Sequence, residues 1–241
     1  SVLALRPLKI PIHIVCPIGV RHPVTPVAVF GSRVTRWLKR LPWEETVADG
    51  AGNNFDILIL GGGSGGYACA LRAVQLGKSV VLIEKGKLGG TCLHTGCIPT
   101  KAMLHAAEIA DGARDGAHFG VKSTFEGIDM PAVNAYKDGV IDRLYKGLQG
   151  LIKSGGITVV EGEGKLVDPH TVEVNGERYS GTNVVLATGS VARTLGLDIG
   201  GRVITSTEAL TMTEVPEKVV IIGGSVIGVE FASVWKSFGA D

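Results

Sequence analysis

A glycine loop set between a strand and a helix constrains the fold of this chain more than any other feature. Residues 55–60, FDILIL, form an apolar run typical of a buried strand, and GGGSGG follows at once. YACALRAVQLG then has the pattern of a helix with a glycine stop, and KSVVLIE is typical of a second strand. Gly61, Gly63 and Gly66 stand at GxGxxG spacing, and Glu84 ends the second strand. This order predicts an α/β fold built on a Rossmann-like βαβ unit.

Each part of this unit has a physical task in holding a dinucleotide. Gly61 permits the tight turn, Gly63 lets backbone approach a pyrophosphate, and Gly66 lets the helix pack on the strand. The helix N-terminus adds N–H donors and a partial positive charge. Glu84 would accept hydrogen bonds from an adenosine ribose, and an acid there disfavours a 2′-phosphate. The loop therefore favours FAD or NAD over NADP but does not choose between the first two.

Two cysteines follow in the segment GGTCLHTGCIPTK, where Cys92 and Cys97 are separated by four residues. A metal half-site, a redox disulfide and a pair of structural thiols are the alternatives. Structural zinc usually takes four ligands, and neither His94 nor His105 has finger spacing to the cysteines, so we expect no metal. Pro99 suits the first turn of a helix, which places Cys97 at its N-terminus, where the helix dipole favours the thiolate.

The remaining pattern alternates helices and short strands. A helix is expected through AMLHAAEIADGAR, and a further one over residues 130–152, with Asp129 as N-cap. ITVVEG, TVEV, ERYS and NVVLAT then predict a small antiparallel insert, in which Asn175-Gly176 suits a type I′ turn. Finally KVVIIGGSVIGVEFASVWKSFGAD repeats the opening order of strand, glycine loop and helix.

These patterns divide the chain into four parts. Residues 1–50 have six prolines and no acid before Glu44, so we expect a basic, Pro-rich, disordered extension. A dinucleotide-binding domain that contains the cysteine pair is predicted over 51–200, a linker over 201–217, and the start of a second Rossmann-like domain over 218–241.

Composition excludes several classes of protein. The net charge is +1 and no dense Lys/Arg cluster exists, which gives no electrostatic reason to expect nucleic-acid binding. Four cysteines are too few for a disulfide-built secreted domain of this length. No apolar run approaches the ~20 residues of a membrane span. We therefore expect no nucleic-acid partner, no membrane insertion and a cytoplasmic location.

The cysteine segment makes a resemblance specific. GGTCLHTGCIPTK resembles the active-site segment of the pyridine nucleotide-disulfide oxidoreductases. Together with ILGGGSGGYACALRAVQLG, VVLIEKGKLGG, YKGLQGLIKSGGITVVEGEGKL and VVLATGS, it is similar to the dihydrolipoyl dehydrogenases of that family. The resemblance covers residues 55–241.

The resemblance implies a flavoenzyme with FAD on the first βαβ unit and NAD on the second. The residues that it assigns to FAD are Gly61, Gly63, Ser64, Gly65, Gly66, Glu84, Lys85, Gly90, Thr91, Cys92, Cys97, Lys101, Gly164, Ala187, Thr188, Gly189 and Ser190. Those at the second nucleotide site are Gly223, Gly224, Ser225, Val226, Ile227 and Gly228. Glu230 is also assigned to cofactor binding, as the partner of Lys101.

It also implies a mechanism. Cys92 corresponds to the interchange thiol that attacks the substrate sulfur, and Cys97 to the charge-transfer thiol beside the flavin. Lys101, paired with Glu230, would stabilise negative charge on the reduced ring. Dihydrolipoamide, carried on the lipoyl domain of a 2-oxo acid dehydrogenase complex, would reduce a Cys92–Cys97 disulfide, and electrons would pass through FAD to NAD+. The alternatives are a mercuric, mycothiol-disulfide or glutathione-type reductase.

The sequence departs from the family pattern in two ways. Ser225 replaces the middle glycine of the second fingerprint, so we expect weaker NAD binding. The family chain is roughly twice as long and dimerises through a C-terminal domain that supplies a His–Glu acid/base pair, for which we find no counterpart. We therefore expect a fragment that is inactive alone, and a non-catalytic FAD-binding fragment is the alternative. The choice between NAD and NADP stays open.

Overall fold

The computed structural model describes residues 12–15 and 53–241, and these divide into two compact units. Of the described residues, one unit comprises 53–94 and 143–190, and we call it the glycine-loop unit. The other comprises the described residues 12–15, 95–142 and 191–241, and we call it the C-terminal unit. Each unit is described by itself below.

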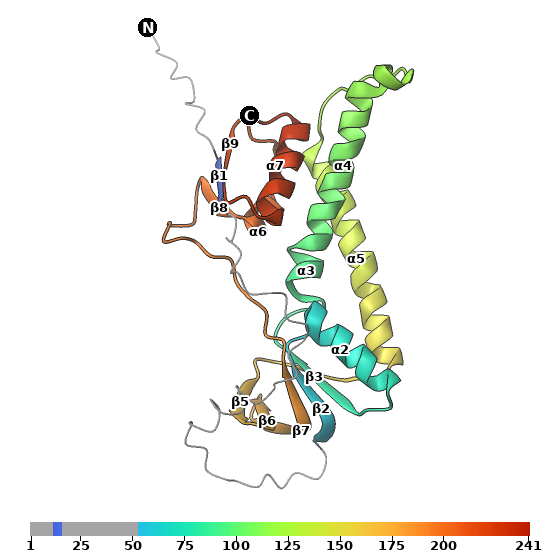
Figure 1. The fold of residues 1–241 in the computed structure, drawn as a ribbon, viewed down its shortest axis with the longest axis vertical. Helices are drawn as coiled ribbons and strands as arrows, with labels where there is room; N and C mark the ends of the chain where they lie inside the picture. Colours follow the sequence, from blue (N-terminus) through green and yellow to red (C-terminus); the bar gives the residue numbers. More distant parts are fainter. Residues whose placement is uncertain (1–11, 16–52) are drawn as a thin grey trace. The chain divides into compact units, whose positions relative to one another are not determined.

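The glycine-loop unit is built on a six-stranded sheet of order β4-β3-β2-β7-β6-β5 (Figure 1). Its parallel part consists of four strands: β2 (Asn54–Leu60), β3 (Val80–Glu84), β4 (Thr158–Glu161) and β7 (Glu177–Leu186). Helix α2 (Ser64–Gln75) connects β2 to β3 and packs on the sheet (Figure 1). The predicted Rossmann-like βαβ unit and the α/β class are confirmed.

An antiparallel extension lengthens this sheet on the far side of β7. Strands β5 (Lys165–Asp168) and β6 (Thr171–Val174) pair antiparallel, and β6 pairs antiparallel with the start of β7. Asn175 and Gly176 have φ of 53° and 81°, as a type I′ turn requires, so the predicted hairpin turn is confirmed. Val172 and Val174 of β6 join Leu58, Val81 and Ile83 in the core of this unit.

Two details of the insert differ from the prediction. The ITVVEG segment forms β4, which pairs parallel with β3 at the sheet edge and so belongs to the parallel part. ERYS and NVVL form one strand, β7, which is antiparallel to β6 at its start and parallel to β2 further along. Gly181 lies within this strand, and its backbone approaches Leu58 of β2 so closely that a Cβ would lie 2.7 Å from the Leu58 Cβ.

Four helical segments follow β3: α3 (Gly90–His94), α4 (Cys97–Asp115), the 3₁₀ turn η1 (Gly116–Phe119) and α5 (Met130–Ser154). The predicted N-cap of α5 is confirmed, because the Asp129 Oδ1 accepts a hydrogen bond of 3.0 Å from the Ala132 N–H. None of the described helices combines the length and apolarity that crossing a membrane requires.

The C-terminal unit contains a three-stranded parallel sheet and the helices that cover it. Strand β1 (Ile12–Val15) lies between β8 (Val203–Thr205) and β9 (Val219–Ile222). Helix α6 (Ser206–Ala209) follows β8, and α7 (Val226–Phe238) follows β9 and packs against α4 (Figure 1). The core is formed by residues of these helices and the segments between them: Met103, Ala107, Met130, Ala209, Leu210, Phe231, Val234, Trp235, Phe238 and Ala240.

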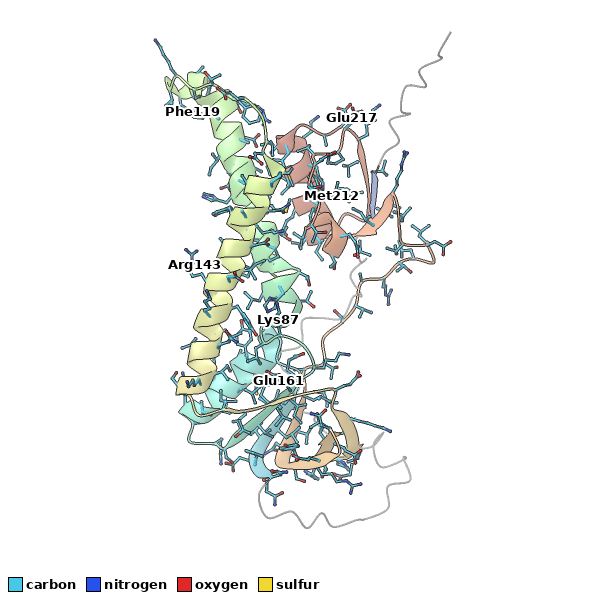
Figure 2. All side chains as sticks on the ribbon, turned by 180° about the vertical axis from the view of Figure 1, so that it is seen from behind. Lys87, Phe119, Arg143, Glu161, Met212 and Glu217 are labelled. Atoms are coloured by element: carbon cyan, nitrogen blue, oxygen red, sulfur yellow. The ribbon has the colours of Figure 1, made fainter. Side chains whose placement is uncertain are left out.

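Two of the predicted parts of the chain, the N-terminal extension and the linker, can be compared with the described elements. The expected disordered extension over 1–50 lies outside the described residues except for 12–15, which form β1. The segment 201–217, predicted as a linker, contains β8 and α6. A pocket of about 520 Å³ lies along this segment and includes Met212 and Glu217, both labelled in Figure 2.

Candidate functional site

The site of the glycine-loop unit lies at the carboxyl edge of its parallel strands. The register pairs Leu60 of β2 with Ile83 of β3 and with Leu186 of β7, so these three strands end together. Glu161, at the end of β4, and Lys87, in the loop after β3, lie at this edge (Figure 2). Ligands of open α/β sheets bind outside the carboxyl ends of the strands, so this edge is where a nucleotide is expected.

The first glycine loop has no room for side chains at two of its fingerprint positions. Gly61 has φ of 105°, and a Cβ there would lie 2.2 Å from the Ala187 carbonyl oxygen. A Cβ on Gly66 would lie 1.8 Å from the Gly61 carbonyl oxygen. Gly63 is the N-cap of α2, in extended conformation and without a side-chain cap, and Ser64 and Gly65 open the helix. The first turn carries no acid, so its N–H donors face no competing carboxylate from within the helix.

Glu84 is held beside this loop by backbone donors. Its Oε2 accepts a hydrogen bond of 2.6 Å from the Gly62 N–H, and its Oε1 accepts one of 2.8 Å from the Gly86 N–H. A carboxylate has about four acceptor positions, so two such bonds leave capacity for hydroxyl donors. The acid predicted to meet a ribose is thus fixed at the loop.

The segment that carries Cys92 is attached to the same loop. The Gly89 N–H donates to the Gly62 carbonyl oxygen over 2.8 Å, and Gly63 and Gly89 form an isolated parallel bridge. A Cβ on Gly90 would lie 2.8 Å from the Gly63 Cα, so the cysteine segment and the glycine loop touch here through their backbones alone. Gly90, Thr91 and Cys92 are the first residues of α3, with Cys92 half-buried.

The C-terminal unit brings a second group of predicted residues together. Cys97 is an exposed thiol and the first residue of α4, as predicted from Pro99. One turn further along α4, the Lys101 Nζ donates to the Glu230 Oε1 of α7. Glu230 belongs to the helix of the second glycine loop, so this ion pair links that loop's helix to the helix that Cys97 begins.

The second glycine loop repeats the geometry of the first. Gly223 has φ of 108°, and a Cβ on Gly228 would lie 2.1 Å from the Gly223 carbonyl oxygen. Gly224 lies in open space, and Val226 and Ile227 begin α7. Ser225 is the N-cap with φ of −77° and ψ of 175°, close to the −70° and −173° of Gly63. Serine thus adopts the backbone conformation of the middle glycine without strain.

The other predicted cofactor residues lie at three places: in an exposed ion pair, after the end of β7, and against the core. The Lys85 Nζ contacts the Glu163 Oε1 at 3.1 Å in an exposed ion pair. Ala187, Thr188, Gly189 and Ser190 leave the end of β7, where the Ala187 N–H donates to the Leu60 carbonyl oxygen over 2.8 Å. Gly164 lies against the core, because a Cβ there would come 2.6 Å from Leu60 Cδ1 and 2.8 Å from Val172 Cγ1.

Sequence reasoning missed three features of the two units. His94, considered only as a metal ligand, contacts the Leu88 carbonyl and the ring of Tyr145. Thr100 is buried, and its hydroxyl donates to the Gly96 carbonyl oxygen over 2.6 Å, which fixes the first turn of α4. Thr205 and Glu208 form a capping box at α6, for which the T-x-x-E spacing was a usable signal.

The donor set fits a dinucleotide at the first loop. The N-terminus of α2 offers backbone N–H groups that no side chain caps, and Gly61 and Gly66 leave no room for a Cβ, as a loop that holds a pyrophosphate requires. The fixed Glu84 carboxylate suits a ribose, so the site suits FAD. Within the described ranges, no three His, Cys, Asp or Glu side chains are arranged to hold a metal ion. Burial raises the pKa of the Cys69 thiol, so it is a weaker nucleophile at neutral pH than an ordinary cysteine.

Two strand–glycine loop–helix modules with a cysteine pair between them define a class of redox flavoprotein fold. Comparison with known families agrees, because residues 55–241 match the pyridine nucleotide-disulphide oxidoreductase family. The chain belongs to this family.

Particular relatives narrow the comparison. The chain is 44% identical over 200 residues to the dihydrolipoyl dehydrogenase of Bacillus subtilis. The matched region covers 77% of this chain and 42% of that protein. It is 40% identical over 195 residues to dihydrolipoyl dehydrogenase 1, mitochondrial, of Arabidopsis thaliana (77% and 38%). It is 39% identical over 217 residues to leghemoglobin reductase of Glycine max (86% and 40%). The chain thus spans about two-fifths of the length of these relatives.

Proposed function

We propose that this chain provides the FAD site and the redox cysteines of a dihydrolipoyl dehydrogenase, which oxidises dihydrolipoamide with NAD+. The observation that carries the proposal is the attachment of the Cys92 segment to the first glycine loop, through the 2.8 Å bond from Gly89 to Gly62 and the Gly63–Gly89 bridge. A dinucleotide cofactor held by that loop has the Cys92 segment next to it along the backbone.

The protein groups have distinct roles in the proposed reaction. One thiolate of dihydrolipoamide attacks the Cys92 Sγ of a Cys92–Cys97 disulfide and releases the Cys97 thiolate. The second substrate thiolate then displaces Cys92, so the substrate leaves as a cyclic disulfide and both cysteines are reduced. FAD, when bound, supplies a two-electron acceptor between this dithiol and NAD+. Lys101, oriented by Glu230, would stabilise the negative charge that develops on the reduced flavin.

The cofactor, partner and location assignments follow from the same proposal. The first glycine loop with Glu84 holds FAD, and the second loop, from Gly223 to Gly228, holds NAD. The substrate is dihydrolipoamide on a lipoyl carrier domain of a 2-oxo acid dehydrogenase complex, and the whole enzyme is a homodimer. We place the protein in the cytoplasm, which cell fractionation followed by immunoblotting would test.

Anaerobic reduction of the FAD-loaded chain tests the function. We expect dihydrolipoamide, and not reduced glutathione at equal thiol concentration, to produce the long-wavelength absorbance of a thiolate beside flavin. The Cys92→Ser and Cys97→Ser variants are expected to lose reduction by the dithiol. Selective reduction by glutathione would favour a glutathione-type reductase instead. FAD binding with no reduction by either thiol would identify a binding fragment and contradict the catalytic role.

A further inference from the structure

His94 is the last residue of α3 and lies two positions after Cys92. Its Nε2 lies 2.8 Å from the carbonyl oxygen of Leu88. Because a carbonyl oxygen only accepts hydrogen bonds, Nε2 must carry the proton in this contact. The bond joins the residue before the Gly89-Gly90 turn to the residue that ends α3, so it closes a short loop around Cys92.

A second contact holds the imidazole from the other side. The rings of His94 and Tyr145, a residue of α5 within the glycine-loop unit, meet edge to face with centroids 5.0 Å apart and an interplanar angle of 76°. Such aromatic pairs are stabilised by their edge-to-face geometry in addition to the area that they bury. His94 is therefore fixed both by a hydrogen bond within its own loop and by a ring from another helix.

The beginning of the same segment is fixed independently. Gly89 is bound to Gly62 and Gly63 of the first glycine loop, as described above, and a Cβ on Gly89 would lie 2.3 Å from Leu93. Leu93 itself is 8% exposed. A helix of five residues has too few internal hydrogen bonds to persist by itself, so α3 depends on the contacts at its two ends.

We propose that His94 is a positioning residue that holds the Cys92 thiol at a fixed place relative to the first glycine loop, through the Leu88 carbonyl and Tyr145. The inference rests on the proposed function only in its account of why Cys92 needs this placement. The glycine contacts secure the start of α3 and His94 secures its end. Loss of the Nε2–H donor frees the last turn of α3, and the half-buried Cys92 becomes more accessible and less well placed.

The test uses the full chain with three variants. His94→Phe keeps a ring for Tyr145 but removes the donor, whereas His94→Gln keeps an N–H donor at a similar reach. His170→Phe is the matched control, because it removes another histidine–carbonyl contact of the same unit, the 3.2 Å contact from His170 Nδ1 to the Gly181 oxygen. Each reduced protein is alkylated with iodoacetamide, and the labelling rates of Cys92 and Cys97 are followed by peptide mass spectrometry.

We expect His94→Phe to raise the Cys92 labelling rate relative to Cys97 by about fivefold or more, because local opening governs access to a half-buried group. His94→Gln and His170→Phe are expected to stay within about twofold of the unmodified chain. An unchanged ratio in His94→Phe would overturn the inference, as would an equal rise in His170→Phe.

A second readout separates this inference from the proposed function. If dihydrolipoamide reduces the FAD-loaded chain, His94→Phe is expected to slow that reduction about tenfold with its flavin content unchanged, and His94→Gln to restore it. If the unmodified chain is not reduced at all, the proposed function fails, while the labelling ratio still decides the role of His94.

Discussion

Gly66 and Gly228 hold equivalent positions in the two glycine loops, and the reason for glycine is the same in both. A Cβ would meet the carbonyl oxygen of Gly61 at 1.8 Å in the first case and that of Gly223 at 2.1 Å in the second. The sequence predicts these positions because the fingerprint itself encodes a close approach of helix to strand. Gly164 differs, because its neighbours are core side chains that come from distant parts of the chain.

Replacement of Gly164 and of Gly147 by alanine is expected to change stability in opposite directions. The Gly164 Cβ would overlap Leu60 and Val172, so Gly164→Ala should lower the free energy of unfolding by about 1–3 kcal/mol. Gly147 is exposed on α5 with no atom near its Cβ position, so Gly147→Ala should raise that free energy by about 0.5–1 kcal/mol. Urea unfolding measures both, and shifts of equal sign would contradict the packing role of Gly164.

At the scale of elements, α6 has only four residues and depends on its cap. The Thr205 hydroxyl accepts from the Thr207 N–H, and the Thr205 N–H donates to the Glu208 carboxylate over 2.7 Å. The Thr205 hydroxyl, by its hydrogen bond to the carboxylate, lowers the pKa of Glu208. A lowered carboxyl pKa stabilises the folded chain above the unfolded-state pKa, and this stabilisation is lost as the pH falls through the folded-state pKa.

Thr205→Ala is therefore expected to cost about 1 kcal/mol of unfolding free energy near neutral pH. The difference from the unmodified chain should shrink between about pH 7 and about pH 3, because protonated Glu208 no longer benefits from the Thr205 hydroxyl, the donor that alanine removes. Thermal unfolding across this range measures it. Thr207→Ala, in the same helix, serves as the control, and a deficit in Thr205→Ala that did not change with pH would contradict the assignment.

The second glycine loop is an element in which one side chain is expected to tune binding. Ser225 keeps the backbone of a middle glycine. In a dinucleotide fingerprint this is the position where backbone approaches the pyrophosphate, so a side chain there would obstruct the approach. We expect Ser225→Gly to bind NAD+ more tightly, by about threefold to tenfold, because backbone approach is no longer obstructed. Calorimetric titration on a chain extended through the complete second domain measures this, and equal affinities would refute the hypothesis.

The elements that the sequence predicted are those whose signals are local. Asp129 caps the start of α5, and Asn175-Gly176 forms the turn between β6 and β7. Both were predictable because capping and turn geometry depend on a few adjacent residues. Pairing of strands is tertiary, which is why the parallel position of β4 was not predicted. His94 was likewise missed because its ring partner, Tyr145, lies on a different helix.

At the scale of the whole molecule, the chain combines two strand–glycine loop–helix modules in two separate units. The cysteine segment crosses from one unit to the other, with Cys92 in the first and Cys97 in the second. Membership of the pyridine nucleotide-disulphide oxidoreductases accounts for both modules and for the cysteines between them. The central claim is that the loop from Gly61 to Gly66 holds FAD beside the Cys92 segment.

Equilibrium titration of the purified chain with FAD tests this claim most directly. The unmodified chain and the Gly147→Ala control should each bind one FAD per chain with the same affinity. Gly61→Ala should weaken binding about tenfold or more, because its Cβ would lie 2.2 Å from the Ala187 oxygen at a φ of 105° and would distort the loop. Circular dichroism verifies that this variant is folded. Failure of the unmodified chain to bind FAD, or equal binding by folded Gly61→Ala, would contradict the account.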